Sequence, residues 1–155
     1  MTVTFSSIPA TFTDLVLKMS ARNSSASGPD ISKIVFNSDT ATNYSVVAAT
    51  GDGTNVSAII AGSLASMQVR NTNGSTSTTN TFGDAQIYIP SYTSTTSKQI
   101  SQSNIIEDNG GANAKVAALA NLYRGTSAIS SMTISSNGGS YAINSSFYLY
   151  GIKNS

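Results

Sequence analysis

The 155-residue sequence contains no cysteine, no histidine and no tryptophan. Without cysteine the chain has no disulfide, thiol nucleophile or thiolate metal site, and without histidine it lacks the commonest general base and zinc ligand. A Ser-His-Asp triad is therefore excluded, and a Ser-Lys pair is the simplest nucleophilic arrangement left. We expect a protein that is not an enzyme and uses no cofactor or metal, so the sequence nominates no catalytic, cofactor-binding or metal-ligating residue.

Charge is scarce as well. Charged residues make up 10% of the chain, and 8 Lys and Arg against 7 Asp and Glu give a net charge of +1; ordinary globular proteins have about 25% charged residues. Such scattered basic residues offer no electrostatic footprint for nucleic acid or an anionic membrane, and we expect neither as a partner. The N-terminal segment lacks a basic start, and no apolar run approaches the roughly 20 residues of a spanning helix, so we expect cytoplasmic synthesis without export by a standard route.

What is abundant is serine and threonine, with 28 and 18 residues, together with 14 asparagines. Turn-forming sequences cut the chain at intervals, and the strongest are Ser27–Asp30, Gly51–Gly53, Asn73–Gly74, Asn109–Gly111 and Asn137–Gly139. Between them the apolar residues mostly alternate with a period of two, which is typical of half-buried strands. The clearest strands are expected at 12–19, 31–37, 44–48, 85–89 and 147–152, with weaker ones at 99–106 and 132–134.

One segment is ambiguous. Residues 112–123 are the only run of good helix formers, and a helix would align Val116, Leu119, Ala120 and Tyr123 on one stripe. A strand would instead place Val116, Ala118, Ala120 and Leu122 on one face. Because its neighbours are strands and a Gly-Thr-Ser turn follows, we interpret it as a strand.

The fold class follows from this pattern. The polar stretches 71–81 and 91–97 are interpreted as solvated loops or loop-edge strands, because neither separates two cores. Roughly eight short strands without a firm helix predict an all-β protein, a single antiparallel β-sandwich or jelly-roll domain over residues 1–155.

Three groups of residues have the composition of a chemical site, and each is better explained as a turn. Asp39 and Asp52 with Asn37 and Asn43 offer oxygen ligands for calcium, but there is no Asp-x-Asp-x-Asp run, and an Asx-type turn at Asp39 is favoured. The glycines at 51, 53, 110 and 111 lack the Lys-Ser/Thr of a phosphate loop. The adjacent carboxylates Glu107 and Asp108 would point to opposite faces of a strand, unlike a glycosidase pair, and are expected in a turn.

Aromatic residues and the low charge point to binding. The 7 tyrosines (44, 88, 92, 123, 141, 148 and 150) suit stacking against sugar rings, but sheets also use tyrosine for cross-strand pairs, and the latter is favoured. Ile, Leu, Val and Phe amount to about 21% of the chain, close to the minimum for an independent core. Few charges and little core favour a protein that is buried in a fixed assembly.

Two stretches resemble a known group of proteins. Leu17–Arg22, followed by Asp30–Tyr44 with its Phe-Asn-Ser-Asp-Thr turn, is similar to a pattern in small virion proteins of tailed phages, many of them marine. The similarity continues through Phe82–Tyr92, Lys98, Leu122–Ile134 and the closing Leu149–Lys153. This chain has Tyr123 where tryptophan is common in the pattern, and it has fewer charges.

The resemblance implies a jelly-roll virion component, made in the host cytoplasm: a capsid decoration protein, a head fibre or a tail adhesin. The sequence contains no coiled-coil or collagen-like repeat for a fibre stalk, which favours a capsid decoration (cement) protein. Such a protein would bind the major capsid protein in the assembled shell, as a homotrimer at local three-fold positions. The alternative is a glycan- or receptor-binding adhesin module on the tail or capsid surface.

Overall fold

The computed structural model describes residues 1–109 and 113–154. Eleven β-strands and no helix are found in these residues. The strands are β1 (Thr2–Phe5), β2 (Asp14–Ala21), β3 (Pro29–Phe36), β4 (Tyr44–Gly51), β5 (Val56–Leu64), β6 (Met67–Asn73), β7 (Gly83–Ile89), β8 (Lys98–Ile106), β9 (Lys115–Tyr123), β10 (Met132–Ser136) and β11 (Ser146–Ile152). Within the described ranges, no helical segment has the length and apolarity to span a bilayer.

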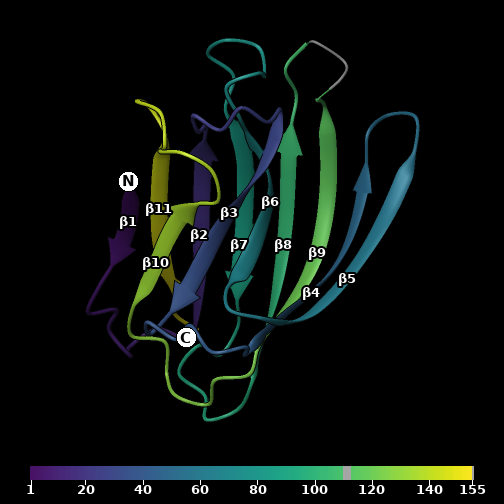
Figure 1. Cartoon of the computed structure of the whole chain (residues 1–155). Coiled ribbons are helices and arrows are strands. Elements are labelled where there is room, and N and C mark those ends of the chain that lie inside the picture. Colours follow the sequence, from purple (N-terminus) through teal and green to yellow (C-terminus); the bar gives the residue numbers. More distant parts are fainter. Residues whose placement is uncertain (110–112, 155) are drawn as a thin grey trace.

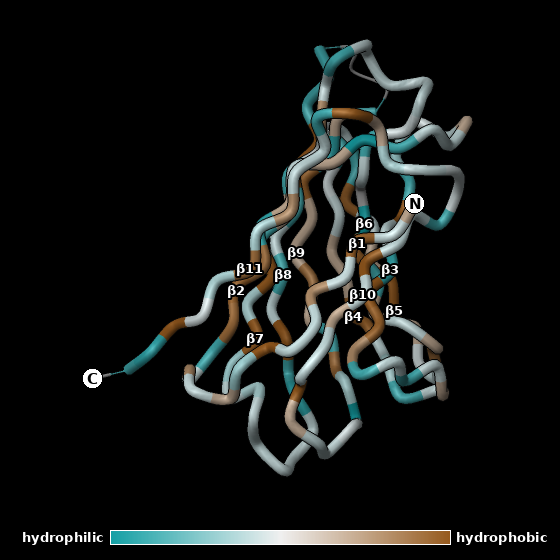
Figure 2. Tube along the Cα trace, turned by 90° about the vertical axis from the view of Figure 1, so that its left-hand side faces the viewer, coloured by the Kyte–Doolittle hydropathy of each residue, from teal (hydrophilic) through white to brown (hydrophobic). Residues whose placement is uncertain are grey.

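The strands form two antiparallel sheets that pack face to face (Figures 1 and 2). The smaller sheet has the order β1-β10-β3-β6, and the larger has the order β11-β2-β7-β8-β9-β4-β5. In a jelly roll, the first, last, third and sixth of eight strands form one sheet, and the second, seventh, fourth and fifth form the other. The observed orders match this scheme if the β7-β8-β9 meander replaces the seventh strand and β11 is added outside β2. The prediction of an antiparallel β-sandwich of jelly-roll type is confirmed.

Alternation of apolar residues places the main core between the sheets. Leu15, Leu17 and Met19 of β2 face inward as predicted, and so do Ile34 and Phe36 of β3. In β11, Phe147 and Leu149 pack against the core while Tyr148 and Tyr150 are exposed. Fully burying each large apolar side chain contributes about 1.5–3 kcal/mol to folding. The two-residue period therefore determines which face of each of these strands is covered.

The ambiguous segment is a strand. β9 pairs with β8 on one side and β4 on the other, so tertiary pairing overrides the helix propensity of its alanines. The face that carries Val116, Ala118, Ala120 and Leu122 points away from the smaller sheet. The alternate residues Ala117, Leu119 and Tyr123 are buried. Ala112 lies outside the described residues.

A polar strip divides the interior into two apolar clusters. The second, smaller cluster consists of Val46, Ala48, Ala117 and Leu119, with Ile59, Ala61 and Leu64 packed against it. The buried amides of Gln102, Asn104 and Asn121 lie on β8 and β9, where the two clusters meet. The Asn121 side chain donates to Gln102 Oε1 at 3.1 Å, and that of Asn104 donates to the carbonyl of Arg70 on β6. The strands β4, β5 and β9 thus share a second, smaller apolar cluster, while Tyr44 and Leu64 also contact the main core.

Sequence patterning missed three of the strands. The strands β1, β5 and β6 were not predicted, and the first residues of the predicted loop 71–81 belong to β6. The rest of that loop wraps around one guanidinium group. Arg22 donates from Nη1 to the carbonyls of Thr78 and Thr81 and from Nη2 to those of Ser75 and Ser77, at 2.8–3.2 Å. This polar loop is therefore fixed to the end of β2.

Candidate interaction surface

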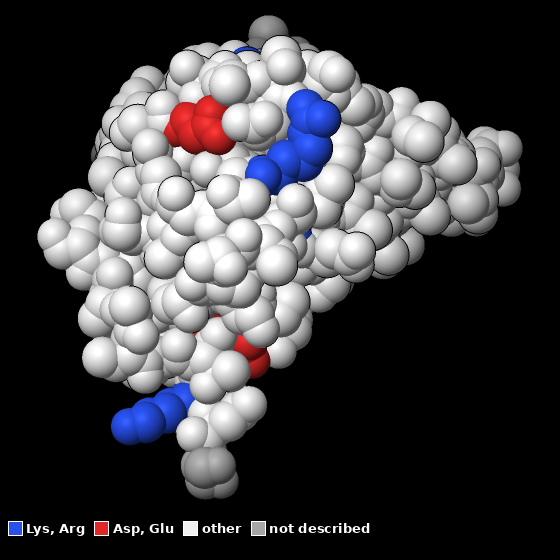
Figure 3. Space-filling view, turned by 90° about the horizontal axis from the view of Figure 1, so that it is seen from below, with Lys and Arg blue, Asp and Glu red and all other residues white. Residues whose placement is uncertain are grey.

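The most distinctive surface is the face of the larger sheet that points away from the smaller one, which we call the outer face. Over β5, β4, β9 and β8 this face carries no charged side chain, and we call this area the uncharged patch. Its outward residues are Val56, Ala58, Ile60 and Gly62 of β5, Ser45, Val47, Ala49 and Gly51 of β4, Val116, Ala118, Ala120 and Leu122 of β9, and Gln99, Ser101, Ser103 and Ile105 of β8. The lobe formed by β4 and β5 shows no charged atom in the view from below (Figure 3).

Large apolar side chains are exposed across the uncharged patch. Val56 and Ile60 are each 83% exposed, and Val47, Ile105 and Val116 are more than half exposed. Val47 and Ile60 are cross-strand partners, and Val47 also pairs with Ala120, so three strands contribute to one continuous apolar row. Exposed apolar patches of this kind mark interaction sites in soluble proteins.

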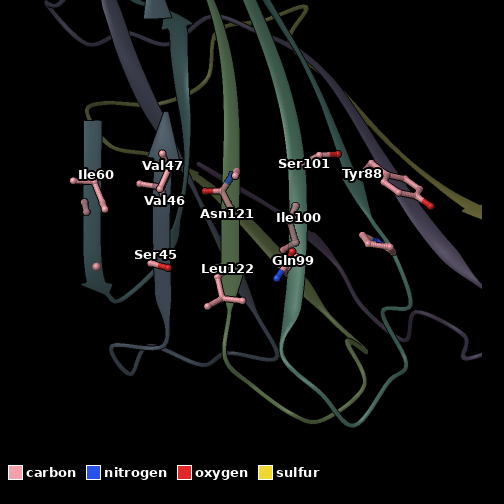
Figure 4. A pocket seen from close by; sticks show the side chains of 14 residues that line it. Ser45, Val46, Val47, Ile60, Tyr88, Gln99, Ile100, Ser101, Asn121 and Leu122 are labelled. Atoms are coloured by element: carbon pink, nitrogen blue, oxygen red, sulfur yellow. The ribbon is translucent and has the colours of Figure 1, made fainter. Parts of the chain in front are cut away.

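The outer face has a shallow hollow beside this apolar row. The hollow, of about 720 Å³, crosses β5, β4, β9, β8 and β7 (Figure 4). Small residues such as Ala120 and Ser101 form its floor, while Ile60, Leu122 and Tyr88 rise around it. The hollow is apolar and open, which suits side chains of a macromolecular partner.

The other end of the outer face, over β7, β2 and β11, is aromatic and polar. Tyr148 and Tyr150 stack with ring centroids 6.4 Å apart and an interplanar angle of 28°. Tyr88 donates a hydrogen bond of 2.8 Å to Asp14 Oδ2, and this bond raises the pKa of the tyrosine. The cross-strand register places Tyr150, Val16 and Tyr88 in one row. The remaining tyrosines, 44, 92, 123 and 141, are buried in the main core.

The two aspartates considered for calcium both organise turns. Asp39 Oδ1 accepts the N–H of Ala41 at 2.9 Å, which confirms the Asx-type turn, and the donated Asn43 amide lowers the pKa of Asp39. Asp52 Oδ1 accepts the N–H groups of Asn55 and Thr54, which lower its pKa. The two carboxylates lie at opposite ends of β4 and are not brought together. Among the described residues there is no cluster of three or more Asp and Glu side chains around a common point.

The remaining candidates also lie in connections. Glu107 is exposed and its Oε1 accepts the N–H of Asn109, while the buried Asp108 receives a hydrogen bond from the Asn113 side chain. Gly51 and Gly53 flank Asp52 in the turn between β4 and β5. Gly110 and Gly111 lie outside the described residues.

Sequence reasoning missed the uncharged patch because β5 was not recognised. The run Val56–Leu64 combines adjacent isoleucines with small residues and contains no charged residue. This composition was the sequence feature that could have indicated the strand. It also missed Lys98, which is 1% exposed and donates from Nζ to the carbonyls of Ser94, Gly125 and Ser127. No family model, curated protein or solved structure matches this chain.

Proposed function

We propose that this chain is a structural protein of a phage virion, a capsid decoration protein that binds the assembled shell and stabilises it. The partner on the shell is the major capsid protein. The observation that supports this proposal is the uncharged patch, because none of the outward-facing residues of β5, β4, β9 and β8 is charged. Jelly-roll topology and the resemblance to small phage virion proteins agree with it.

The physical basis is burial without a desolvation penalty. Covering Val47, Ile60 and Val116 removes apolar surface from water, which contributes about 25 cal/mol for each Å². No charged group of this patch has to lose its hydration when a partner docks. A protein that binds assembled shell and not free subunits stabilises the assembly by mass action.

Ala120→Asp tests the docking surface on purified shells. Ala120 lines the hollow on β9, between β8 and β4, where a bound partner would bury the unpaired carboxylate of the variant. We expect binding of the variant to stripped shells to weaken at least about tenfold, equivalent to about 1.4 kcal/mol. Sedimentation of labelled protein with shells measures this.

The matched control is Thr4→Asp, which adds the same charge at an exposed position of β1 in the other sheet. Shells coated with wild type or with Thr4→Asp should release DNA at a higher temperature than stripped shells. Equal release temperatures for coated and stripped shells, or equal binding of the two variants, would contradict a cementing role.

A second candidate function is glycan or receptor binding, favoured by the exposed Tyr148–Tyr150 pair. Two stacked rings beside Lys18, the cross-strand partner of Tyr148, offer a flat platform with a polar edge. In this case a glycan array should show binding that the Tyr148→Ala/Tyr150→Ala double variant loses. An array without signals would remove this candidate and leave the shell-binding proposal intact.

A further inference from the structure

The strand β5 is an open edge of the larger sheet. It runs over nine residues, and among the described strands it pairs with β4 alone. Natural proteins protect long edge strands with charges, proline or a covering element, because unpaired backbone groups recruit other strands. β5 contains neither a charged residue nor proline, and its large apolar residues Val56 and Ile60 are each 83% exposed. This edge therefore lacks the usual protection against pairing with another strand.

The backbone groups that point to the open edge follow from the turn. Asp52 donates its N–H to the carbonyl of Asn55 at 3.1 Å, so these two residues form a hydrogen-bonded pair. In an antiparallel ladder, hydrogen-bonded and non-bonded pairs alternate. The N–H and C=O groups of Ser57, Ile59 and Ala61 therefore point to β4. Those of the alternate residues point outward, namely Val56, Ala58, Ile60 and Gly62.

We propose that β5 pairs antiparallel with β5 of a second copy of this chain, across a two-fold axis at Ile59. In this register all the outward-pointing residues find partners: Val56 lies opposite Gly62 of the second copy, and Ala58 lies opposite Ile60. About eight backbone hydrogen bonds form, two for each bonded pair. The two larger sheets become one continuous sheet.

Side-chain size makes the edge complementary to itself. At each bonded pair a large residue meets a small one, since Val56 meets glycine and Ile60 meets alanine. Cross-strand neighbours lie about 4.5–5.5 Å apart, so a small residue opposite a large one leaves room for close packing. Other registers lose bonded pairs at the ends of the strand. Beyond Gly62 the edge ends, because Ser63 has a φ of 55° and the register with β4 shifts there.

Charge also favours a second copy. The outward-facing residues of β4 and β5 are uncharged, so two copies meet without like-charge repulsion or buried unpaired charge. The contact is isologous and uses the same edge from both chains, so it closes as a dimer. The trimer expected from the sequence requires a different, heterologous contact. This inference goes beyond shell binding and does not depend on it.

Cysteine substitution tests the axis directly, because the chain contains no cysteine of its own. Ile59 pairs with itself in a non-bonded position, where Cα atoms lie about 4.5 Å apart, within disulfide range. Ile59→Cys should therefore form a disulfide-linked dimer on mild oxidation, seen on a non-reducing gel. Ser57→Cys lies on the same strand, but in this register it lies opposite Ala61 of the second copy. The two introduced cysteines are therefore offset by four residues along the strands, about 13 Å. It should remain monomeric on the gel.

Sedimentation equilibrium tests the pairing without cysteine. Wild type should show about twice the 16.0 kDa mass of one chain. Ala58→Pro removes an N–H that points to the open edge and leaves the bonds to β4 in place. Ile60→Lys places a charge in the contact. Each should raise the dissociation constant at least about tenfold, equivalent to about 1.4 kcal/mol, while circular dichroism remains that of the wild type.

Ser103→Lys is the matched control, since it adds the same charge to the exposed outer face of β8, away from the edge. It should dimerise like wild type. A monomer or trimer for wild type, equal cross-linking of both cysteine variants, or equal dissociation constants for Ile60→Lys and Ser103→Lys would overturn the proposal. Shell binding by Ala120→Asp is measured separately, so the two proposals fail independently.

Discussion

Raising the pH from 10 to 12 is expected to destabilise the fold by about 4 kcal/mol, or about 2 kcal/mol for each of two buried tyrosines. Burial raises the pKa of Tyr123 and of Tyr141 to about 12, from 10.0 in an exposed tyrosine. Groups with a raised folded-state pKa stabilise the fold below pH 10, and this contribution is lost as pH rises through the folded value. Each pKa unit corresponds to about 1.4 kcal/mol. Burial raises the pKa of Tyr44 as well, which adds to the loss.

Burial raises these pKa values even though the hydrogen bonds with Phe36 and Ser32 lower them, so burial is the larger effect. The Tyr44 hydroxyl donates to the carbonyl of Asp39 and accepts from the N–H of Phe36, both at 3.0 Å. The Tyr141 hydroxyl donates to Ser32 Oγ at 2.8 Å. Burial lowers the pKa of Lys98, so its contribution to the free energy of unfolding increases with pH, opposite to that of the tyrosines. This increase occurs below pH 10.5, and it therefore does not cancel the loss caused by the tyrosines at higher pH.

Urea unfolding at a series of pH values measures this dependence. Tyr141→Phe should reduce the loss between pH 10 and 12 by about 2 kcal/mol, because one of the groups with a raised pKa is gone. At pH 7 the same variant should be less stable by about 1 kcal/mol, from the lost hydrogen bond. A free energy of unfolding that is constant between pH 10 and 12 would contradict this prediction.

Lys98→Met should lower the free energy of unfolding by about 2–3 kcal/mol. Lys98 Nζ donates to three main-chain carbonyls, at 2.8 Å to Ser94, 3.0 Å to Gly125 and 2.7 Å to Ser127. It thereby joins the loop after β7 to the connection after β9. Methionine fills a similar volume, so the loss reports the hydrogen bonds rather than a cavity. Unsatisfied buried carbonyls cost about 1–3 kcal/mol each, less where water reaches them.

Lys18→Met is the control for removing a lysine charge. Lys18 is exposed on the outer face of β2, and its substitution should change stability by no more than about 0.5 kcal/mol. Urea unfolding at pH 7 compares the two variants. Equal stabilities for Lys98→Met and Lys18→Met would show that the buried ammonium contributes nothing.

Local patterning predicted those strands that have one buried face. β2, β3 and β11 alternate cleanly because their inner residues pack in the main core and their outer residues meet solvent. β5 does not alternate, since Ile59 packs on the smaller cluster while its neighbour Ile60 faces outward. β6 was hidden because its polar end runs into the low-complexity loop. Periodicity fails where both faces of a strand carry apolar residues.

The sheet order and the site depend on long-range pairing, which a local pattern does not contain. Nothing in the sequence indicates that β1 pairs with β10 or that β11 joins the edge beside β2. The uncharged patch combines residues from four strands, so it becomes visible only when these strands are placed side by side. The Asx turn at Asp39 was predictable, because its contacts lie within two residues.

The polar strip between the two apolar clusters has a consequence for motion. Gln102, Asn104 and Asn121 lie between the buried residues of the two clusters, and among the described residues Leu64 alone packs against both. Opening the β4–β5 hairpin would therefore break its ladder with β9 and the small cluster, while most of the main core stays closed, so we expect the hairpin to open as a flap before the other strands. Its amide protons should exchange with deuterium sooner than those of β2 and β7, and covering the flap should slow them.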